Sequence, residues 1–163
     1  MSINGYGLSE DWLHLLVALH VLSAVVGIGP TFFGHILFRS GQTLGQLRGS
    51  LGLMRILEKF PKILGSLAVL TGLLLAWLGD YGFGQFWIYG SIALYVIIQT
   101  LVIGVLAPIA KKVAAQAFSS AESPDRPLSP ELAAGVARVN GLQYLISALG
   151  VLLFLFMFFK PTL

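Results

Sequence analysis

The residues best suited to chemistry are the three histidines, His14, His20 and His35, which all lie in one apolar stretch, residues 12–38. A stretch of about 27 residues forms a helix about 40 Å long, more than the ~30 Å hydrocarbon core of a bilayer. An imidazole ring inside a membrane helix is costly unless it has a partner, so such residues mark candidate functional sites. The chain contains no cysteine, which excludes disulfides, thiolate metal ligands and thiol catalysis.

Polar and small residues around these histidines recur at three- and four-residue steps. Positions at this spacing share one face of a helix. We therefore predict that this face points toward the other helices of a bundle and carries His20, Ser23, Gly27, Thr31 and His35.

His20 is our candidate axial ligand for a b-type haem, because imidazole is a common ligand of haem iron. Gly27, about two turns further along the same face, leaves room for a flat porphyrin against the backbone. An alignment of the spans by depth places Leu74 and Tyr95 near the level of His20. Ser23, Gly27 and Tyr95 therefore line the predicted pocket.

Each histidine also has a plainer interpretation. His20 can be a neutral ring that is hydrogen-bonded to Tyr95 or to a backbone carbonyl freed by Pro30. His35 is fifteen residues further on, about 22 Å along a helix, which is too far from His20 to share a metal ion. Its ring can reach the headgroups at the inner boundary, and His14 near the outer surface can stay hydrated. Both are weaker candidates for a metal ligand.

A second iron ligand is not supplied by another histidine, because all three lie on one helix. The site is then five-coordinate, or uses Met157 or Tyr95, or is completed by a second copy in a symmetric dimer. His20 is the first metal-ligand candidate, followed by His35, His14 and Met157.

The composition is that of an integral membrane protein. Hydrophobic residues make up 56% of the 163 residues and charged residues only 10%, and the mean hydropathy is +0.86. Soluble domains contain about 25% charged residues. We predict one transmembrane domain over residues 1–163, an all-α four-helix bundle with spans at residues 12–38, 63–78, 87–110 and 141–159.

Two further segments between the spans are predicted to be helical. Residues 40–62 alternate basic and apolar positions at three- and four-residue steps, the pattern of an interfacial helix. Ser129 and Pro130 are typical of a helix start and predict a short helix toward Asn140. In the second span, Ala68, Gly72 and Ala76 form a small-residue seam that permits close helix packing or contacts in a homo-oligomer.

Basic residues set the predicted orientation. Only Lys160 lies at the end where the chain terminates, while nine basic residues lie in the two loops between spans one and two and between spans three and four. By the positive-inside rule the protein is a multi-pass protein of the inner (plasma) membrane with both termini on the non-cytoplasmic side. The net charge of +3 therefore indicates contact with membrane lipid phosphates and not with nucleic acid. The nine basic residues in the two loops are Arg39, Arg48, Arg55, Lys59, Lys62, Lys111, Lys112, Arg126 and Arg138.

Residues 18–39, ALHVLSAVVGIGPTFFGHILFR, resemble the first span of a group of small bacterial membrane proteins. The group includes the copper resistance protein D family, haem-containing membrane protoporphyrinogen oxidases and a related four-span family of unknown function. The shared features are the Leu-His-Val turn, a glycine after it and a histidine at the inner end. The runs at residues 70–73 and 159–161 resemble the family of unknown function most.

This resemblance implies that His20 matches the haem-ligating histidine of the oxidases. The chain departs from them after Pro30, where Thr31 and two phenylalanines replace the usual arginine, and its third span has no lysine before Lys111. The leading hypothesis is thus a haem-binding membrane protein suited to electron transfer. The alternatives are a transport or assembly component without a cofactor and an oxidoreductase acting on porphyrin or quinone. The sequence leaves open whether the protein is an enzyme.

Overall fold

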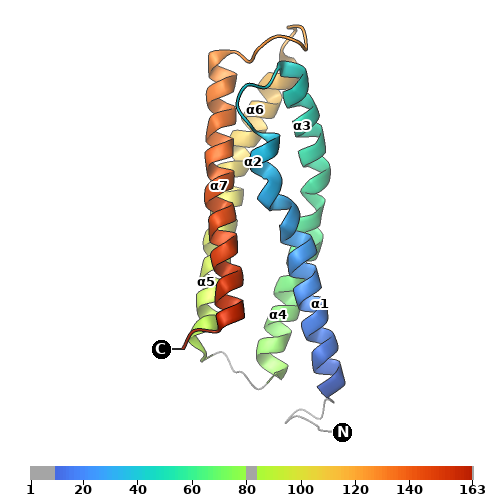
Figure 1. The fold of residues 1–163 in the computed structure, drawn as a ribbon, viewed down its shortest axis with the longest axis vertical. Coiled ribbons are helices and arrows are strands. Elements are labelled where there is room, and N and C mark those ends of the chain that lie inside the picture. The colour runs from blue at the N-terminus through green and yellow to red at the C-terminus, as the bar shows by residue number, and fades with distance from the viewer. Residues whose placement is uncertain (1–9, 80–83, 163) are drawn as a thin grey trace.

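The computed structural model describes residues 10–79 and 84–162, and within them the fold is all-helical. Four helices are long and apolar enough to cross a membrane. They run side by side along the long axis of the molecule, and α1 begins at the end where α7 terminates (Figure 1). The predicted four-helix membrane bundle is confirmed. The four helices are Glu10–Leu37, Leu44–Leu78, Phe86–Ser119 and Pro130–Phe159.

The first long helix is interrupted at Pro30. It consists of α1 (Glu10–Ile28), a 3-10 segment (Gly29–Phe33) and α2 (Gly34–Leu37). Proline has no backbone N–H and cannot continue the α-helical hydrogen-bond ladder, so the chain tightens into a 3-10 turn. The hydroxyl of Thr31 donates to the carbonyl oxygen of Ile28 at 2.6 Å and compensates part of the disruption.

The second and third long helices each contain a π-helical turn next to a proline. The second is α3 (Leu44–Leu57), a π turn (Pro61–Gly65) and α4 (Ser66–Leu78); the third is α5 (Phe86–Thr100), a π turn (Leu101–Leu106) and α6 (Ala107–Ser119). Residues 40–62 are therefore largely helical as predicted, but they continue into the second span. A helix satisfies its own backbone hydrogen bonds in water and in lipid, so the membrane boundary alone does not end it.

The fourth long helix, α7 (Pro130–Phe159), is uninterrupted. Its start is the predicted one, because the Ser129 side chain accepts a hydrogen bond from the backbone N–H of Leu132 at 3.4 Å. The short helix predicted toward Asn140 is the first third of α7. At about 45 Å for 30 residues, this helix is longer than the hydrocarbon core.

One end of the molecule has a hydrophobic core of large side chains, and we call it the packed end. It comprises α2, α3, α6 and residues 130–146 of α7. Arg48 stabilises it by donating to the carbonyl oxygens of Ala117 and Ser120, at 2.8 and 2.7 Å, where α6 ends. The core residues are Phe38, Leu44, Leu47, Leu106, Val113, Ala117, Leu132, Val136, Val139 and Ile146.

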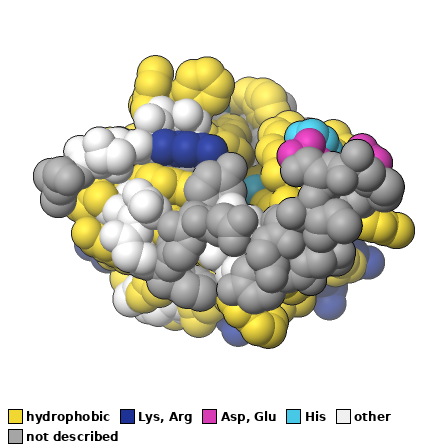
Figure 2. All heavy atoms as spheres, turned by 90° about the horizontal axis from the view of Figure 1, so that it is seen from below, with side chains coloured by type: hydrophobic (Ala, Val, Ile, Leu, Met, Phe, Trp, Pro, Cys, Tyr) yellow, Lys and Arg dark blue, Asp and Glu magenta, His cyan; other side chains and the backbone are white. Residues whose placement is uncertain are grey.

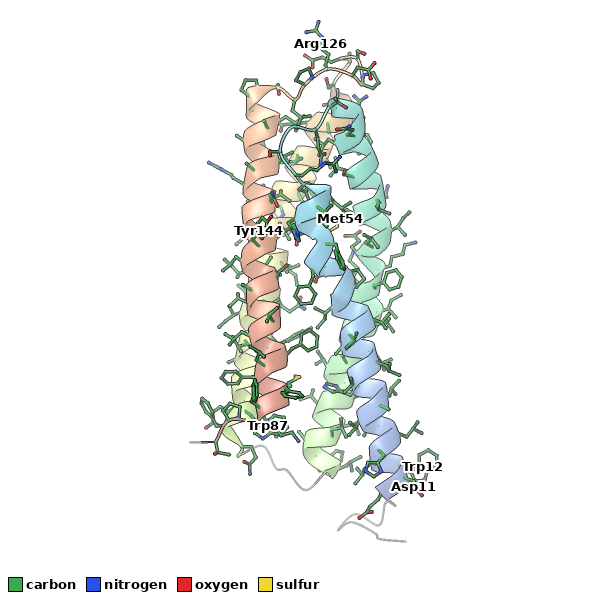
Figure 3. All side chains as sticks on the ribbon, viewed as in Figure 1. Asp11, Trp12, Met54, Trp87, Arg126 and Tyr144 are labelled. Carbon is green, nitrogen blue, oxygen red and sulfur yellow. The ribbon has the colours of Figure 1, made fainter. Side chains whose placement is uncertain are left out.

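The other end consists of two helix pairs, and we call it the paired end. Here α1 packs on α4, and α5 packs on the second half of α7. The ribbons of the two pairs stand apart toward the end that carries the termini (Figure 1). Seen from that end, hydrophobic side chains are visible on several sides of the outline, with charged side chains among them (Figure 2). Trp12 and Trp87 lie at this end (Figure 3), as expected for aromatic residues at a membrane boundary.

Phe32 links the two pairs near the middle of the molecule. Its ring lies 6.3 Å from the ring of Phe154, measured between centroids. A β-carbon at Gly150 would stand 3.4 Å from the same ring. The first and fourth long helices are thus held together at the 3-10 segment.

Candidate functional site

His20 binds α4 through one ring nitrogen. Its Nδ1 lies 2.8 Å from the carbonyl oxygen of Ala68 and 3.3 Å from Oγ1 of Thr71. The Thr71 hydroxyl in turn donates to the carbonyl oxygen of Leu67 at 2.8 Å. The plainer interpretation of a hydrogen-bonded histidine is therefore observed, but its partners lie on α4 and are neither Tyr95 nor a carbonyl freed by Pro30.

The Ala68 partner fixes the tautomer of His20. A carbonyl oxygen can only accept a hydrogen bond, so Nδ1 carries the proton. In the neutral ring Nε2 then presents a lone pair. Nε2 has no hydrogen-bond partner among the described residues, and it is not one of the atoms sealed from the surface.

The ring of His20 rests on Gly72. A β-carbon at residue 72 would stand 2.9 Å from Cε1 and 3.8 Å from Nε2 of the imidazole. The small-residue seam predicted on the second span thus contacts α1, and the glycine of the seam makes room for the histidine.

Gly27 lies in the same interface between the first and second long helices, where it contacts backbone. A β-carbon there would stand 2.7 Å from the amide nitrogen of Gly65 and 2.9 Å from the carbonyl carbon of Leu64. The backbone of the second long helix therefore fills the face that we expected a porphyrin to use. Glycine at position 27 permits helix-to-helix contact, as glycines do in many membrane helix pairs.

The remaining members of the predicted pocket are divided between the two pairs. Ser23 is only 3% exposed and lies on α1. Tyr95 lies on α5, in a shallow groove of about 400 Å³. The structure thus brings His20, Ser23 and Gly27 to one helix pair and places Tyr95 on the other. The groove is lined by Tyr95, Val96, Gln99, Thr100, Ile103 and Gly104.

The weaker metal candidates lie on three different helices, α1, α2 and α7. His14 is exposed two turns before His20, and Met157 is half-buried near the end of α7. His35 stacks on Tyr144, with 4.7 Å between ring centroids. Among residues 10–79 and 84–162, no three His, Cys, Asp or Glu side chains are grouped to hold a metal ion.

Two features of the site were not anticipated from the sequence. The first is Thr71 as a partner of His20. Its position between Ala68 and Gly72 of the predicted seam could have indicated this role. The second is a polar group on α7, where Asn140, Gln143 and Ser147 follow at steps of three and four residues. Such a stripe in an apolar helix predicts a polar contact with a neighbour.

Comparison with known proteins gives one match. Residues 14–161 match a family model described as a predicted integral membrane protein (DUF2269). No curated protein and no solved structure matches the chain.

Proposed function

The chain belongs to DUF2269, a family of predicted integral membrane proteins, and from this premise we propose that it binds haem b through His20 and takes part in electron transfer. The observation that carries the proposal is that Nδ1 of His20 is bonded to the carbonyl oxygen of Ala68, while Nε2 has no hydrogen-bond partner among the described residues.

The surroundings of His20 suit an axial ligand. Metal-binding histidines usually donate their other ring N–H to a carbonyl or carboxylate, which fixes the tautomer and orients the ring. The bond from Nδ1 to the carbonyl oxygen of Ala68, at 2.8 Å, is of this kind. Haem iron alternates between two oxidation states and would supply the capacity to carry one electron.

The same geometry limits how haem can be held. The backbone at Leu64 and Gly65 covers the face of Gly27, so a porphyrin must approach His20 from the Nε2 edge of the ring. Tyr95 and Met157, the candidate second ligands, lie on the α5–α7 pair. Within one chain His20 would therefore be the residue that holds the haem, and a second protein ligand would require the two pairs to move together or a second copy of the chain.

The sequence resemblance supports this proposal. Residues 18–39 resemble the first span of small bacterial membrane proteins that include haem-containing oxidases, and His20 occupies the matching position. The grouping with these proteins and with the copper resistance protein D family is part of the proposal.

The test is an absorption spectrum of the protein purified from cells supplied with haem. We expect a Soret band in the wild type that disappears in His20→Ala. His14→Ala is the matched control, because His14 lies on the same helix but is exposed, and this variant should keep the band. A colourless wild type, or an undiminished band in His20→Ala, contradicts the proposal.

A second candidate, an assembly or transport component without a cofactor, is favoured by the closeness of α1 and α4. In this case the bond from His20 to Ala68 only ties the two helices together. His20→Asn separates the candidates, because the asparagine amide can still donate to the Ala68 carbonyl but offers no ligand to iron. Loss of the Soret band, with an unchanged unfolding temperature when both proteins are compared free of haem, favours haem binding. A colourless wild type favours the second candidate.

A further inference from the structure

The shallow groove beside Tyr95, which we call the α5 groove, is formed by one helix alone. All the residues that line it belong to α5 or to the π turn Leu101–Leu106 that continues it. The helix on which α5 packs is α7 (Figure 1), and no residue of α7 lines the groove. In the most apolar 18-residue window of the third long helix only 6% of the residues are buried, against 17–22% in the other three long helices. The third long helix is therefore the one that the rest of the chain covers least.

Gln99 in this groove has a carboxamide without a partner. Its side chain is half-buried, yet neither the amide nitrogen nor the oxygen is sealed from the surface, and no described residue bonds to them. The neighbouring Thr100 differs, because its hydroxyl donates to the carbonyl oxygen of Val96 at 2.8 Å. Gln99 thus presents both a donor and an acceptor to whatever covers the groove.

The depth of Gln99 makes an unpaired carboxamide costly. Trp87, at the membrane boundary, lies twelve residues before Gln99, and Lys111, the first basic residue after it in this helix, lies twelve residues beyond. Twelve residues span about 18 Å of helix, so Gln99 lies near the middle of a hydrocarbon core about 30 Å thick. No water is available there to replace a missing hydrogen bond. Polar side chains at this depth are typically paired with another helix.

We propose that a second copy of this chain covers the α5 groove in a symmetric dimer, in which Gln99 of each copy bonds to Gln99 of the other. Two copies inserted in the same direction place identical residues at the same depth, and a two-fold axis along the membrane normal brings them together. A carboxamide both donates and accepts, so it is complementary to itself. A lipid acyl chain in the groove offers neither a donor nor an acceptor. The proposal does not rest on haem binding, because the groove lies on α5 and His20 lies on α1.

The shape of the groove fits a second helix. Thr100 and Gly104 are small residues four positions apart, a spacing that lets two membrane helices approach closely. A β-carbon at Gly104 would meet nothing within 4 Å, whereas at Gly27 the same position is filled by the backbone of the second long helix. Ile103, which is 68% exposed, lies beside Gly104 and can pack against the second copy. The space at Gly104 is thus left for a neighbour outside the chain.

The lack of cysteine in the chain permits a test with single thiols. Thr100→Cys places a thiol in the groove, and Ile97→Cys is the matched control, because Ile97 is exposed on the same helix but does not line the groove. Both proteins are reconstituted at a high ratio of lipid to protein and oxidised with iodine, which enters the bilayer. A disulfide requires Cα atoms within about 7 Å, so we expect disulfide-linked dimers of Thr100→Cys to form at least tenfold faster than those of Ile97→Cys. Equal rates, or faster linkage at residue 97, overturn the proposal.

A second measurement needs no cysteine and tests the role of the carboxamide. Energy transfer between copies labelled at the N-terminus is followed as the liposomes are diluted with lipid, which gives the dissociation constant of the dimer. We expect Gln99→Leu to weaken association by about 3- to 20-fold, the range that corresponds to hydrogen bonds between membrane helices. Gln99→Asn keeps a carboxamide and should recover part of the affinity. Tyr89→Phe, which removes a polar group from α5 outside the groove, should leave association unchanged.

Two outcomes of this measurement contradict the proposal. A wild type that stays monomeric in the bilayer overturns it, whether lipid or a different protein then covers the groove. A dimer whose affinity is the same in Gln99→Leu also overturns it, because the two copies then meet through another face. Unchanged circular dichroism of each variant verifies that the helices are intact.

Discussion

The packed end and the paired end bury different kinds of side chain. At the packed end Leu47 is 0% exposed, whereas at the paired end Leu22 is 63% exposed. The residues that α1 and α4 bury against each other are small or polar, among them Ser23, Ala24, Gly27 and Thr71. The same chain therefore packs like a soluble helical bundle at one end and like a pair of membrane helices at the other.

The difference follows from the solvent around each end. In water, burial of large apolar side chains drives helices together. In lipid this driving force is absent, and close backbone contact and interhelical hydrogen bonds hold helices instead. The second and third long helices have 35 and 34 residues, about 52 Å of helix, so part of each extends beyond the hydrocarbon core.

The largest effect expected from this comparison is that of Leu47→Ala. The substitution leaves a cavity in a fully packed core and should lower the free energy of unfolding by about 2–5 kcal/mol. Leu22→Ala removes the same atoms from an exposed position and should change it by less than about 1 kcal/mol. Denaturant unfolding in detergent compares the two, and equal losses would mean that both ends are packed alike.

A smaller effect is expected at the contact between α1 and α4. Gly27→Ala places a β-carbon against the backbone of Leu64 and Gly65, which cannot move aside as a side chain does. We expect a loss of about 1–3 kcal/mol and a lower unfolding temperature. Gly49→Ala is the control, because a β-carbon there, in the interior of α3, meets nothing within 4 Å. Similar stabilities for these two variants would contradict the close backbone contact.

Much of this architecture is predictable from the sequence for local reasons. The four spans follow from their apolar length, the break in the first helix follows from Pro30, and the start of α7 follows from Ser129 and Pro130. The seam of Ala68 and Gly72 also predicted a close helix contact. Each of these features depends on residues that are near one another in the chain.

The partner of His20 could not be predicted in the same way. The depth alignment assumed a constant rise per residue and placed Leu74 and Tyr95 beside it, whereas the ring contacts Ala68, Thr71 and Gly72. The 3-10 segment and the π turns change the rise and the direction of the side chains. In addition, the order of helices around the bundle depends on apolar faces that are too similar to distinguish by hydropathy. Neighbours in space therefore had to come from the structure.

The smallest expected effect concerns His20, where two variants distinguish the contribution of its hydrogen bond to stability from the contribution of its packing. His20→Ala removes both. Its hydrogen-bond part should lower the free energy of unfolding by about 0.6 kcal/mol, the mean for hydrogen bonds between membrane helices, and by no more than about 1.7 kcal/mol. His20→Asn keeps a donor for the carbonyl oxygen of Ala68 and should recover most of that loss. Thermal unfolding of the haem-free proteins measures both. If the two variants are equally unstable, the Nδ1 bond contributes nothing, and the α1–α4 pair is held by its small residues alone.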